Sequence, residues 1–179
     1  MLARLRLPFR ATAPNIDEQR GLGETPRAMA RRLALEKARA VALEHDRAIV
    51  IGADQVVSLN GLALGKPGSL PLAIEQLQAL SGQRVVFHSA VAVISPFGSQ
   101  LSVSDSIAKF RKLSSSQITY YVQADQPTDT AGSAKAEQLG IALLEELSSD
   151  DPTAIIGLPL IELTRMLGRT GLDPLSRDT

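Results

Sequence analysis

Apolar residues recur at the three- and four-residue spacing of a helix face early in the chain. The stripe consists of Ala30, Leu33, Ala34, Ala38 and Val41. Thr25 and Pro26 stand before it, and they are residue types that favour the N-cap and the first turn of a helix. We therefore predict a helix from Pro26 to about His45. Lys37 falls on the same stripe, so its ammonium group must either extend along the apolar surface to water or find an anionic partner.

A continuous apolar run follows at residues 48–53 and is typical of a strand that is covered on both faces. Asp54 directly follows this run, and ligands bind at the carboxyl ends of strands in open α/β sheets. Residues 56–59 and 62–64 flank Asn60-Gly61, a pair that tolerates the positive φ angles of a two-residue hairpin turn. The hairpin is expected to return Lys66 toward Asp54.

The rest of the chain alternates between helix and strand patterns. We predict helices at residues 72–80, 114–122 and 158–167, and strands at residues 84–94 and 101–110. Residues 154–157 favour one more buried strand, while residues 140–147 fit either a strand or a helix. The alternation favours one α/β domain over residues 1–172, and residues 173–179 are expected to form a disordered tail.

Composition and charge narrow the possible partners. The chain has 179 residues, with 19 basic and 19 acidic side chains, so no overall field attracts nucleic acid or an anionic membrane. It has no cysteine, which excludes disulfides, thiolate metal sites and cysteine nucleophiles. No apolar run approaches the roughly 20 residues of a membrane span. We therefore expect a cytoplasmic protein that has neither nucleic acid nor a membrane as its partner.

Several polar residues could carry chemistry, and each also has a simpler interpretation. Asp54 could be a general base or a metal ligand, or an ordinary aspartate at a strand end. Lys66 could be a fixed charge for phosphate or a solvated loop lysine. Glu18 could help to bind a hard cation or belong to a solvated turn. Residues 130–137 include Lys135 and Glu137 among small side chains, which suits either a ligand-binding loop or an exposed surface loop.

Five motifs occur in the order typical of the Maf family of nucleoside triphosphate pyrophosphatases. They are Asn15-Ile16-Asp17-Glu18, Glu36-Lys37-Ala38, Ile51-Gly52-Ala53-Asp54-Gln55-Val56-Val57, Gly65-Lys66-Pro67 and Gly157-Leu158-Pro159-Leu160. The sequence resembles this family from about Leu2 to Gly168. The resemblance implies a single-domain fold similar to inosine triphosphatase, with a mixed sheet, flanking helices and a ligand cleft.

The same resemblance implies an activity and a set of site residues. Members of the family hydrolyse a nucleoside triphosphate to the monophosphate and pyrophosphate with a divalent cation, Mg²⁺, Mn²⁺ or Co²⁺, and a homodimer is a family-level expectation. By carry-over, Asp54 activates water and shares the metal with Glu18. Glu18, Lys37 and Lys66 bind the triphosphate, whereas Gln55 and Glu137 contribute to base selection.

The residues Ala131-Gly132-Ser133, Lys135 and Glu137 are most similar to the branch that cleaves 7-methyl-GTP. A dTTP and UTP pyrophosphatase is the alternative within the family, although a carboxylate at Glu137 would be unexpected there. A catalytically inactive nucleotide-binding regulator of cell division is the non-enzyme alternative. The family's first strand and its loop with serine and arginine have no counterpart before Leu2. We therefore expect a chain that lacks this segment, with stability and activity reduced accordingly.

Overall fold

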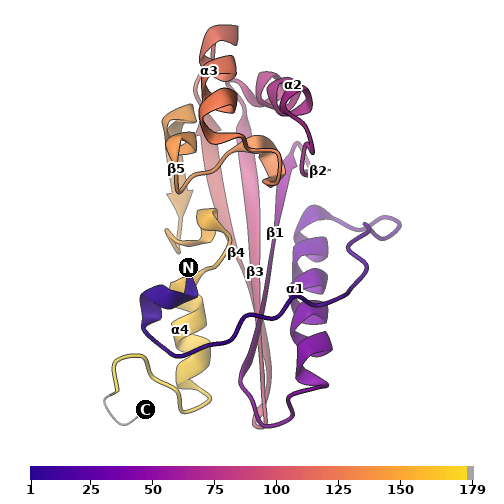
Figure 1. The fold of residues 1–179 in the computed structure, drawn as a ribbon, viewed down its shortest axis with the longest axis vertical. Helices are drawn as coiled ribbons and strands as arrows, with labels where there is room; N and C mark the ends of the chain where they lie inside the picture. Colours follow the sequence, from indigo (N-terminus) through magenta and orange to yellow (C-terminus); the bar gives the residue numbers. More distant parts are fainter. Residues whose placement is uncertain (177–179) are drawn as a thin grey trace.

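A computed structural model describes residues 1–176, and its five strands form one sheet in the order β2-β1-β3-β4-β5 (Figure 1). The strands are β1 Val50–Leu59, β2 Leu62–Leu64, β3 Arg84–Ser95, β4 Gly98–Phe110 and β5 Leu144–Ser149. The α-helices are α1 Pro26–Ala42, α2 Leu70–Leu80, α3 Ser115–Asp125 and α4 Leu160–Gly168. Short 3₁₀ helices occur at η1 Leu2–Leu5, η2 Ala131–Ser133, η3 Leu139–Leu143 and η4 Ala154–Ile156.

All neighbouring strands of the sheet are antiparallel. The predicted single α/β domain is confirmed, but the expectation of a mixed sheet is corrected for residues 1–176. Tight turns join β1 to β2 and β3 to β4, which only antiparallel neighbours allow, whereas the longer connections that contain α2 and α3 return the chain to the same end of the sheet. The predicted hairpin turn is also confirmed, with φ angles of 49° at Asn60 and 79° at Gly61.

Helices cover both faces of the sheet. On one face, Ala30, Ala34 and Ala38 of α1 pack against alternate residues of β1 and β3. On the other face, α2 and α3 form a core with Val57 and Phe87, and α4 forms a second one with Val91 and Val93. Figure 1 shows α2 and α3 at one end of the long strands, with α1 and α4 flanking the other end. The apolar run at the start of β1 is therefore covered on both faces, as predicted.

Strand β1 continues beyond the boundary expected from the sequence. We predicted that a first strand ends before Asp54, but the ladder with β3 runs from Val50 to Ser58 without interruption and pairs Asp54 with Ala90. Asp54 therefore lies within a strand and not at its carboxyl end. In the sequence, the polar pair Asp54-Gln55 resembles the end of a strand. A strand can continue through these residues because their side chains are only half buried, and their backbones remain paired with β3.

The outer edge of β1 is mostly open. Strand β2 pairs with β1 only at Val57, Ser58 and Leu59. From Val50 to Val56, the outer edge of β1 has no strand partner within residues 1–176. A bound molecule can therefore approach Asp54 and Gln55 from this edge.

Most other predicted elements are confirmed, with small shifts of their ends. Helix α1 ends at Ala42 and not at His45, whereas α2, α3, α4, β3 and β4 match their predicted positions. Residues 140–147 contain both η3 and the start of β5. The strand predicted at residues 154–157 is wrong, because the Asp151 carboxylate bonds the backbone N–H of Thr153 and the chain turns into η4.

The predicted disorder of residues 173–179 stays a prediction, since residues 177–179 lie outside the described part of the chain. Within residues 1–176, no helix is both long and apolar enough to cross a membrane.

Gly52 allows α1 to pack closely against β1 next to Asp54. A Cβ atom at Gly52 would lie 2.3 Å from the Ala34 carbonyl oxygen and 2.6 Å from the Ala38 nitrogen. Both atoms belong to the helix backbone, so a Gly52→Ala substitution must displace α1. We expect this change to lower the free energy of unfolding by about 1–3 kcal/mol, measured by urea denaturation. Gly168→Ala, where an added Cβ meets nothing within 4 Å, is the control. Equal unfolding midpoints for both variants would contradict this view of the packing.

Candidate active site

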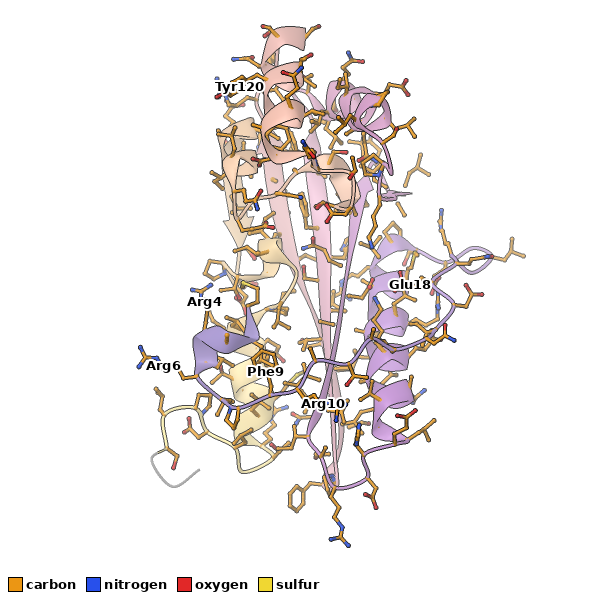
Figure 2. All side chains as sticks on the ribbon, in the orientation of Figure 1. Arg4, Arg6, Phe9, Arg10, Glu18 and Tyr120 are labelled. Atoms are coloured by element: carbon orange, nitrogen blue, oxygen red, sulfur yellow. The ribbon has the colours of Figure 1, made fainter. Side chains whose placement is uncertain are left out.

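Three charged side chains from distant parts of the sequence meet beside β1. The Lys37 ammonium of α1 lies 2.6 Å from an Asp54 carboxylate oxygen and 2.8 Å from a carboxylate oxygen of Glu18. Glu18 belongs to the segment that precedes α1, and Figure 2 shows it beside that helix. Lys37 thus bridges two carboxylates that the sequence separates by 36 positions, and this supports the anionic-partner interpretation of Lys37.

Burial and neighbouring charges shift the pKa values of Lys37 and Asp54 in opposite directions. Burial is the largest influence on the Asp54 carboxyl and raises its pKa above the ordinary value, although the hydrogen bond and charge of Lys37 act to lower it. Burial also acts to lower the pKa of Lys37, but hydrogen bonds to Asp54 and Glu18 together raise it. The hydrogen bond from Lys37 lowers the pKa of Glu18. Lys37 is therefore a firm cation, while Asp54 is a stronger base than an exposed aspartate.

Lys66 contributes a second positive charge from the loop that follows β2. Leu64 pairs with Val57 in the β1–β2 ladder, so the loop that carries Lys66 leaves the ladder close to Asp54. The Lys66 charge acts to lower the pKa of Glu18 and opposes the rise in the pKa of Asp54. The loop is held on both sides, since Gln76 donates to the Gly65 carbonyl at 3.0 Å and Gly68 donates to the Thr128 carbonyl at 2.9 Å. The Lys66 side chain is exposed and makes no ion pair within residues 1–176. The predicted return of this loop toward Asp54 is confirmed.

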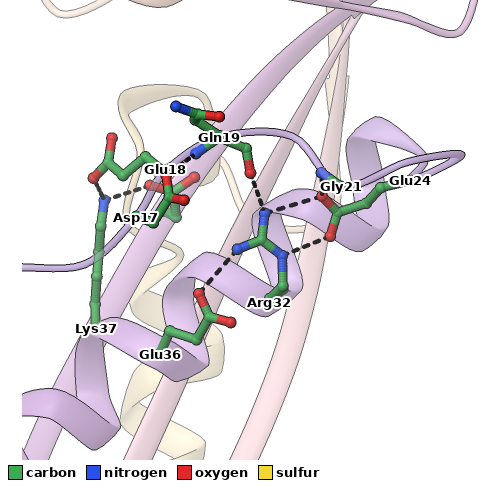
Figure 3. A network of polar contacts seen from close by, with 9 residues as sticks. Asp17, Glu18, Gln19, Gly21, Glu24, Arg32, Glu36 and Lys37 are labelled. Carbon is green, nitrogen blue, oxygen red and sulfur yellow. Dashed lines mark hydrogen bonds and ion pairs between the residues drawn. The ribbon is translucent and has the colours of Figure 1, made fainter.

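A second network, which we did not predict from the sequence, holds the loop that carries Glu18. Arg32 forms two hydrogen bonds to the Glu24 carboxylate, at 2.8 and 3.0 Å, and a third to Glu36 at 2.9 Å (Figure 3). It also donates to the carbonyl oxygen of Gln19, the residue next to Glu18, at 2.9 Å. The bonds from Arg32 and from the Gly21 N–H lower the pKa of Glu24 to about 2.

The network makes Arg32 a positioning residue for Glu18. On the expectation from the family resemblance that Glu18 binds a divalent cation, Arg32→Met should raise the cation concentration for half-maximal activity about tenfold, because partners behind a metal ligand typically contribute this much to affinity. Arg31→Met is a matched control, since Arg31 lies exposed on α1. Titration of activity with magnesium measures the effect. An Arg32→Met curve that coincides with the control curve would argue against a positioning role.

Gln55 lies on the opposite face of β1 from Asp54, because successive side chains of a strand point to opposite faces. Its amide nitrogen donates to the Ser89 hydroxyl at 2.8 Å and to the carbonyl oxygens of Ala154 and Ile155 at 3.0 and 3.2 Å. Gln55 therefore contacts η4, which follows Asp151 and precedes Gly157. The sheet itself therefore separates Gln55 from the Lys37 cluster.

Glu137 is exposed in the turn between η2 and η3, and it forms no ion pair within residues 1–176. The structure does not bring it into contact with the Lys37 cluster. Its segment does share a face of the sheet with Gln55, since Gly132 of η2 lies against the side chain of Val57. The neighbouring Lys135 instead pairs with Asp129 at 3.1 Å and donates to the Asp125 carbonyl at 3.3 Å. Lys135 and Glu137 thus do not pair with each other.

A cavity of about 670 Å³ adjoins the site on the open side of β1. It is lined by the start of β1, the segment that precedes α1, and α4 with its flanking residues; the lining includes Phe9, Ile49, Ile51, Ala53, Leu158 and Leu167. None of the six predicted site residues lines this cavity. The charged cluster thus lies beside an apolar cavity and not inside it.

A serine, a histidine and an aspartate also form a chain of side-chain contacts across neighbouring strands. Ser58 lies 3.1 Å from Nε2 of His88, and Nδ1 of His88 lies 2.8 Å from Asp105. The order resembles that of a hydrolytic triad. However, Ser58 is 4% exposed while Asp105 lies at the surface, so the hydroxyl is inaccessible to a substrate. These residues form a cross-strand structural network.

A family model and several known proteins match nearly the whole chain. A family model described as Maf-like protein matches residues 1–170. A 7-methyl-GTP pyrophosphatase of Bordetella pertussis is 53% identical over 176 residues, which cover 98% of this chain and 88% of the relative. The protein of the same name from Bordetella avium is 54% identical over 177 residues, covering 98% and 89%. That of Polaromonas sp. is 52% identical over 175 residues, covering 96% and 80%.

Proposed function

The chain belongs to the Maf-like protein family, and on that premise we propose that it hydrolyses 7-methyl-GTP to 7-methyl-GMP and pyrophosphate. The observation that carries the proposal is the half-buried Lys37–Asp54 contact of 2.6 Å, which brings a carboxylate and a fixed cation together beside the open edge of β1. The names of the relatives, whose sequences align with nearly all of this chain, support the choice of substrate.

Each charged residue has a distinct role in this reaction. Lys37 and Lys66 offset the negative charge of the phosphates, and this charge stabilisation grows as charge develops in the transition state. The arriving phosphates compete with Asp54 for the Lys37 ammonium group, which frees the Asp54 carboxylate to accept a proton from water. The water attacks phosphorus, the bond between the α- and β-phosphates breaks, and pyrophosphate leaves.

The site also suits a divalent cation held by Glu18 and Asp54. Both carboxylates approach the same Lys37 ammonium group, so their oxygens already converge on one positive charge. Magnesium is commonly bound through one or two carboxylates together with substrate phosphates and water, which fits a pair of ligands. When bound, Mg²⁺, Mn²⁺ or Co²⁺ would neutralise phosphate charge as a Lewis acid. Removal of the cation by a chelator should abolish turnover, and its re-addition should restore it.

The free Glu137 carboxylate supports the preference for a methylated base. Methylation at N7 gives guanine a positive charge, which a nearby carboxylate attracts more strongly than a neutral base. Lys135 is the nearest candidate to cancel this charge, but it is held by Asp129 and by the Asp125 carbonyl. Glu137 therefore keeps its charge available for the base.

Competition among nucleotides tests the proposal. Equal concentrations of 7-methyl-GTP, GTP, dTTP and UTP are mixed with the protein, and the four monophosphates are followed by chromatography. We expect 7-methyl-GMP to form fastest. A preference for dTTP or UTP would assign the chain to the alternative activity of the family. Binding without pyrophosphate release, measured by calorimetry, would instead support a nucleotide-binding regulator of cell division.

The setting of this activity follows from the same proposal. Hydrolysis of a modified nucleoside triphosphate belongs to nucleotide metabolism, and we propose a cytoplasmic location for it. A homodimer and the absence of nucleic acid partners stay predictions. Sedimentation of the purified protein tests the first of these.

A further inference from the structure

The side chain of Gln76 on α2 connects the loop that carries Lys66 to η2. Its amide nitrogen donates to the Gly65 carbonyl oxygen at 3.0 Å, and its amide oxygen accepts from the Ser133 hydroxyl at 2.6 Å. A backbone carbonyl can only accept hydrogen bonds, so the nitrogen must face Gly65 and the oxygen must face Ser133. Both ends of the amide group are therefore held, and the side chain links the two loops directly.

The hydrogen bond to Gly65 also restrains the backbone of Lys66. The Gly65 carbonyl and the Lys66 N–H belong to one planar peptide unit, which ends at the Lys66 Cα atom. On the other side of Lys66, Pro67 is buried, and a proline restricts the residue before it to extended backbone conformations. The Lys66 backbone is thus constrained from both sides, while the Lys66 side chain is exposed.

The η2 end of this link is anchored to β1. Ser133 is fully buried, and Gly132 beside it packs so closely that an added Cβ atom would lie 2.9 Å from Cγ1 of Val57. Ser133 has a φ angle of 52°, in the left-handed region that residues other than glycine seldom adopt. Such a conformation persists where the surrounding structure determines it. The position of the Ser133 hydroxyl is therefore set by β1, the strand that carries Asp54.

A second attachment holds the far end of the Lys66 loop. The Gly68 N–H donates to the Thr128 carbonyl oxygen at 2.9 Å. Both attachments lead to the same part of the chain, residues 128–133, and neither uses the Lys66 side chain. The Lys66 ammonium group makes no ion pair within residues 1–176. The loop is therefore fixed at both ends, and the charge that it carries stays available to a bound anion.

We infer that Gln76 is a positioning residue for Lys66, and that Ser133 orients Gln76. Through this link, β1 sets the place of the Lys66 charge relative to Asp54 on the same strand. The inference rests on the proposed function, in which Lys66 offsets the charge of the phosphates. A charge that is already in place needs no rearrangement when the phosphates arrive, and such preorganised charges stabilise a transition state most effectively.

Replacement of Gln76 by leucine removes both hydrogen bonds and keeps a side chain of similar size. We expect kcat/KM for 7-methyl-GTP to fall about tenfold, because displacement of a positioned group by about 1 Å can cost up to about 10²-fold. Gln78→Leu is the matched control on the same helix, since Gln78 is exposed and makes no side-chain hydrogen bond within residues 1–176. Equal activity of the two variants would overturn the inference.

A double-mutant cycle with Lys66→Met separates positioning from a general structural role. If Gln76 acts through Lys66, the double variant Gln76→Leu/Lys66→Met should be no less active than Lys66→Met alone. A general loss of stability would instead lower activity in both backgrounds. A further loss of about tenfold in the double variant would therefore overturn the inference.

Ser133→Ala tests the orienting role of the hydroxyl. This variant leaves the hydrogen bond from Gln76 to Gly65 possible, so we expect a smaller loss of kcat/KM than in Gln76→Leu and no further loss in the Lys66→Met background. Ser106→Ala is the control, because Ser106 is also fully buried and also donates to one side chain. Equal losses in Ser133→Ala and Ser106→Ala would contradict the role of Ser133.

NMR relaxation without nucleotide keeps this inference distinct from the proposed function. The order parameter of the Lys66 backbone N–H should be near ~0.85, the value of rigid backbone, in the wild type and in Gln78→Leu, and it should fall toward ~0.6 in Gln76→Leu. If no nucleotide is hydrolysed, the proposed function fails, whereas this measurement still decides whether Gln76 holds Lys66 in place. A mobile Lys66 N–H in the wild type, or an unchanged order parameter in Gln76→Leu, would contradict the inference.

Discussion

Replacement of Asp54 by asparagine is expected to lower kcat about 10³-fold or more, because a general base typically contributes 10²–10⁴-fold. Asparagine keeps the shape of the side chain but cannot accept a proton from water. Lys37 still has Glu18 as a partner at 2.8 Å, so the fold and the phosphate-binding charge remain. Nucleotide binding should therefore stay measurable by calorimetry while pyrophosphate release nearly disappears.

Asp46→Asn is the matched control for this change. Asp46 is an exposed aspartate in the turn between α1 and β1, and it makes no ion pair within residues 1–176. Its replacement should leave both binding and turnover close to those of the wild type. Substantial activity of Asp54→Asn would refute the assignment of the base, whereas loss of binding together with turnover would point to a role in holding the phosphates.

Replacement of Glu137 by glutamine is expected to lower kcat/KM for 7-methyl-GTP about tenfold or more, which corresponds to a charge interaction of about 1.4 kcal/mol. Glutamine keeps the size and one acceptor oxygen, so the change isolates the charge. Glu137 is exposed, and solvent would screen its charge until the bound nucleotide covers it. Activity on unmethylated GTP should fall much less.

Glu145→Gln serves as the control for Glu137, because Glu145 is an exposed glutamate of β5 that makes no ion pair within residues 1–176. The ratio of kcat/KM between 7-methyl-GTP and GTP is the quantity to compare. It should fall in Glu137→Gln and stay constant in Glu145→Gln. An equal loss on both nucleotides in Glu137→Gln would defeat the proposed role in base recognition.

The main elements of the fold could be predicted from local patterns. The apolar stripe of α1, the Asn60-Gly61 turn and the long β3 each show a clear period or turn signal. The continuity of β1 was missed because Asp54 and Gln55 interrupt its apolar run, and only pairing with β3 reveals that the strand continues. The turn at η4 is formed by the short-range bond between Asp151 and Thr153, and it is fixed by bonds from Ile161 and Glu162 to Asp151 that only the folded chain brings together.

The candidate site could be predicted only in part. The ordered motifs identified Glu18, Lys37, Asp54 and Lys66, and the structure brings their charges together. The Arg32 network was missed, since an arginine eight positions from Glu24 on a helix is ordinary in sequence and becomes informative only when the loop folds back. The separation of Gln55 from Asp54 by the sheet follows from strand alternation once β1 is known to continue.

The identity of the products tests the central claim most directly. Purified protein is incubated with 7-methyl-GTP and a divalent cation, and the products are resolved by ³¹P NMR during the reaction. The account predicts equal amounts of 7-methyl-GMP and pyrophosphate, with no diphosphate intermediate, and no products from the Asp54→Asn variant. Formation of 7-methyl-GDP and orthophosphate, or identical product formation by wild type and Asp54→Asn, would contradict it.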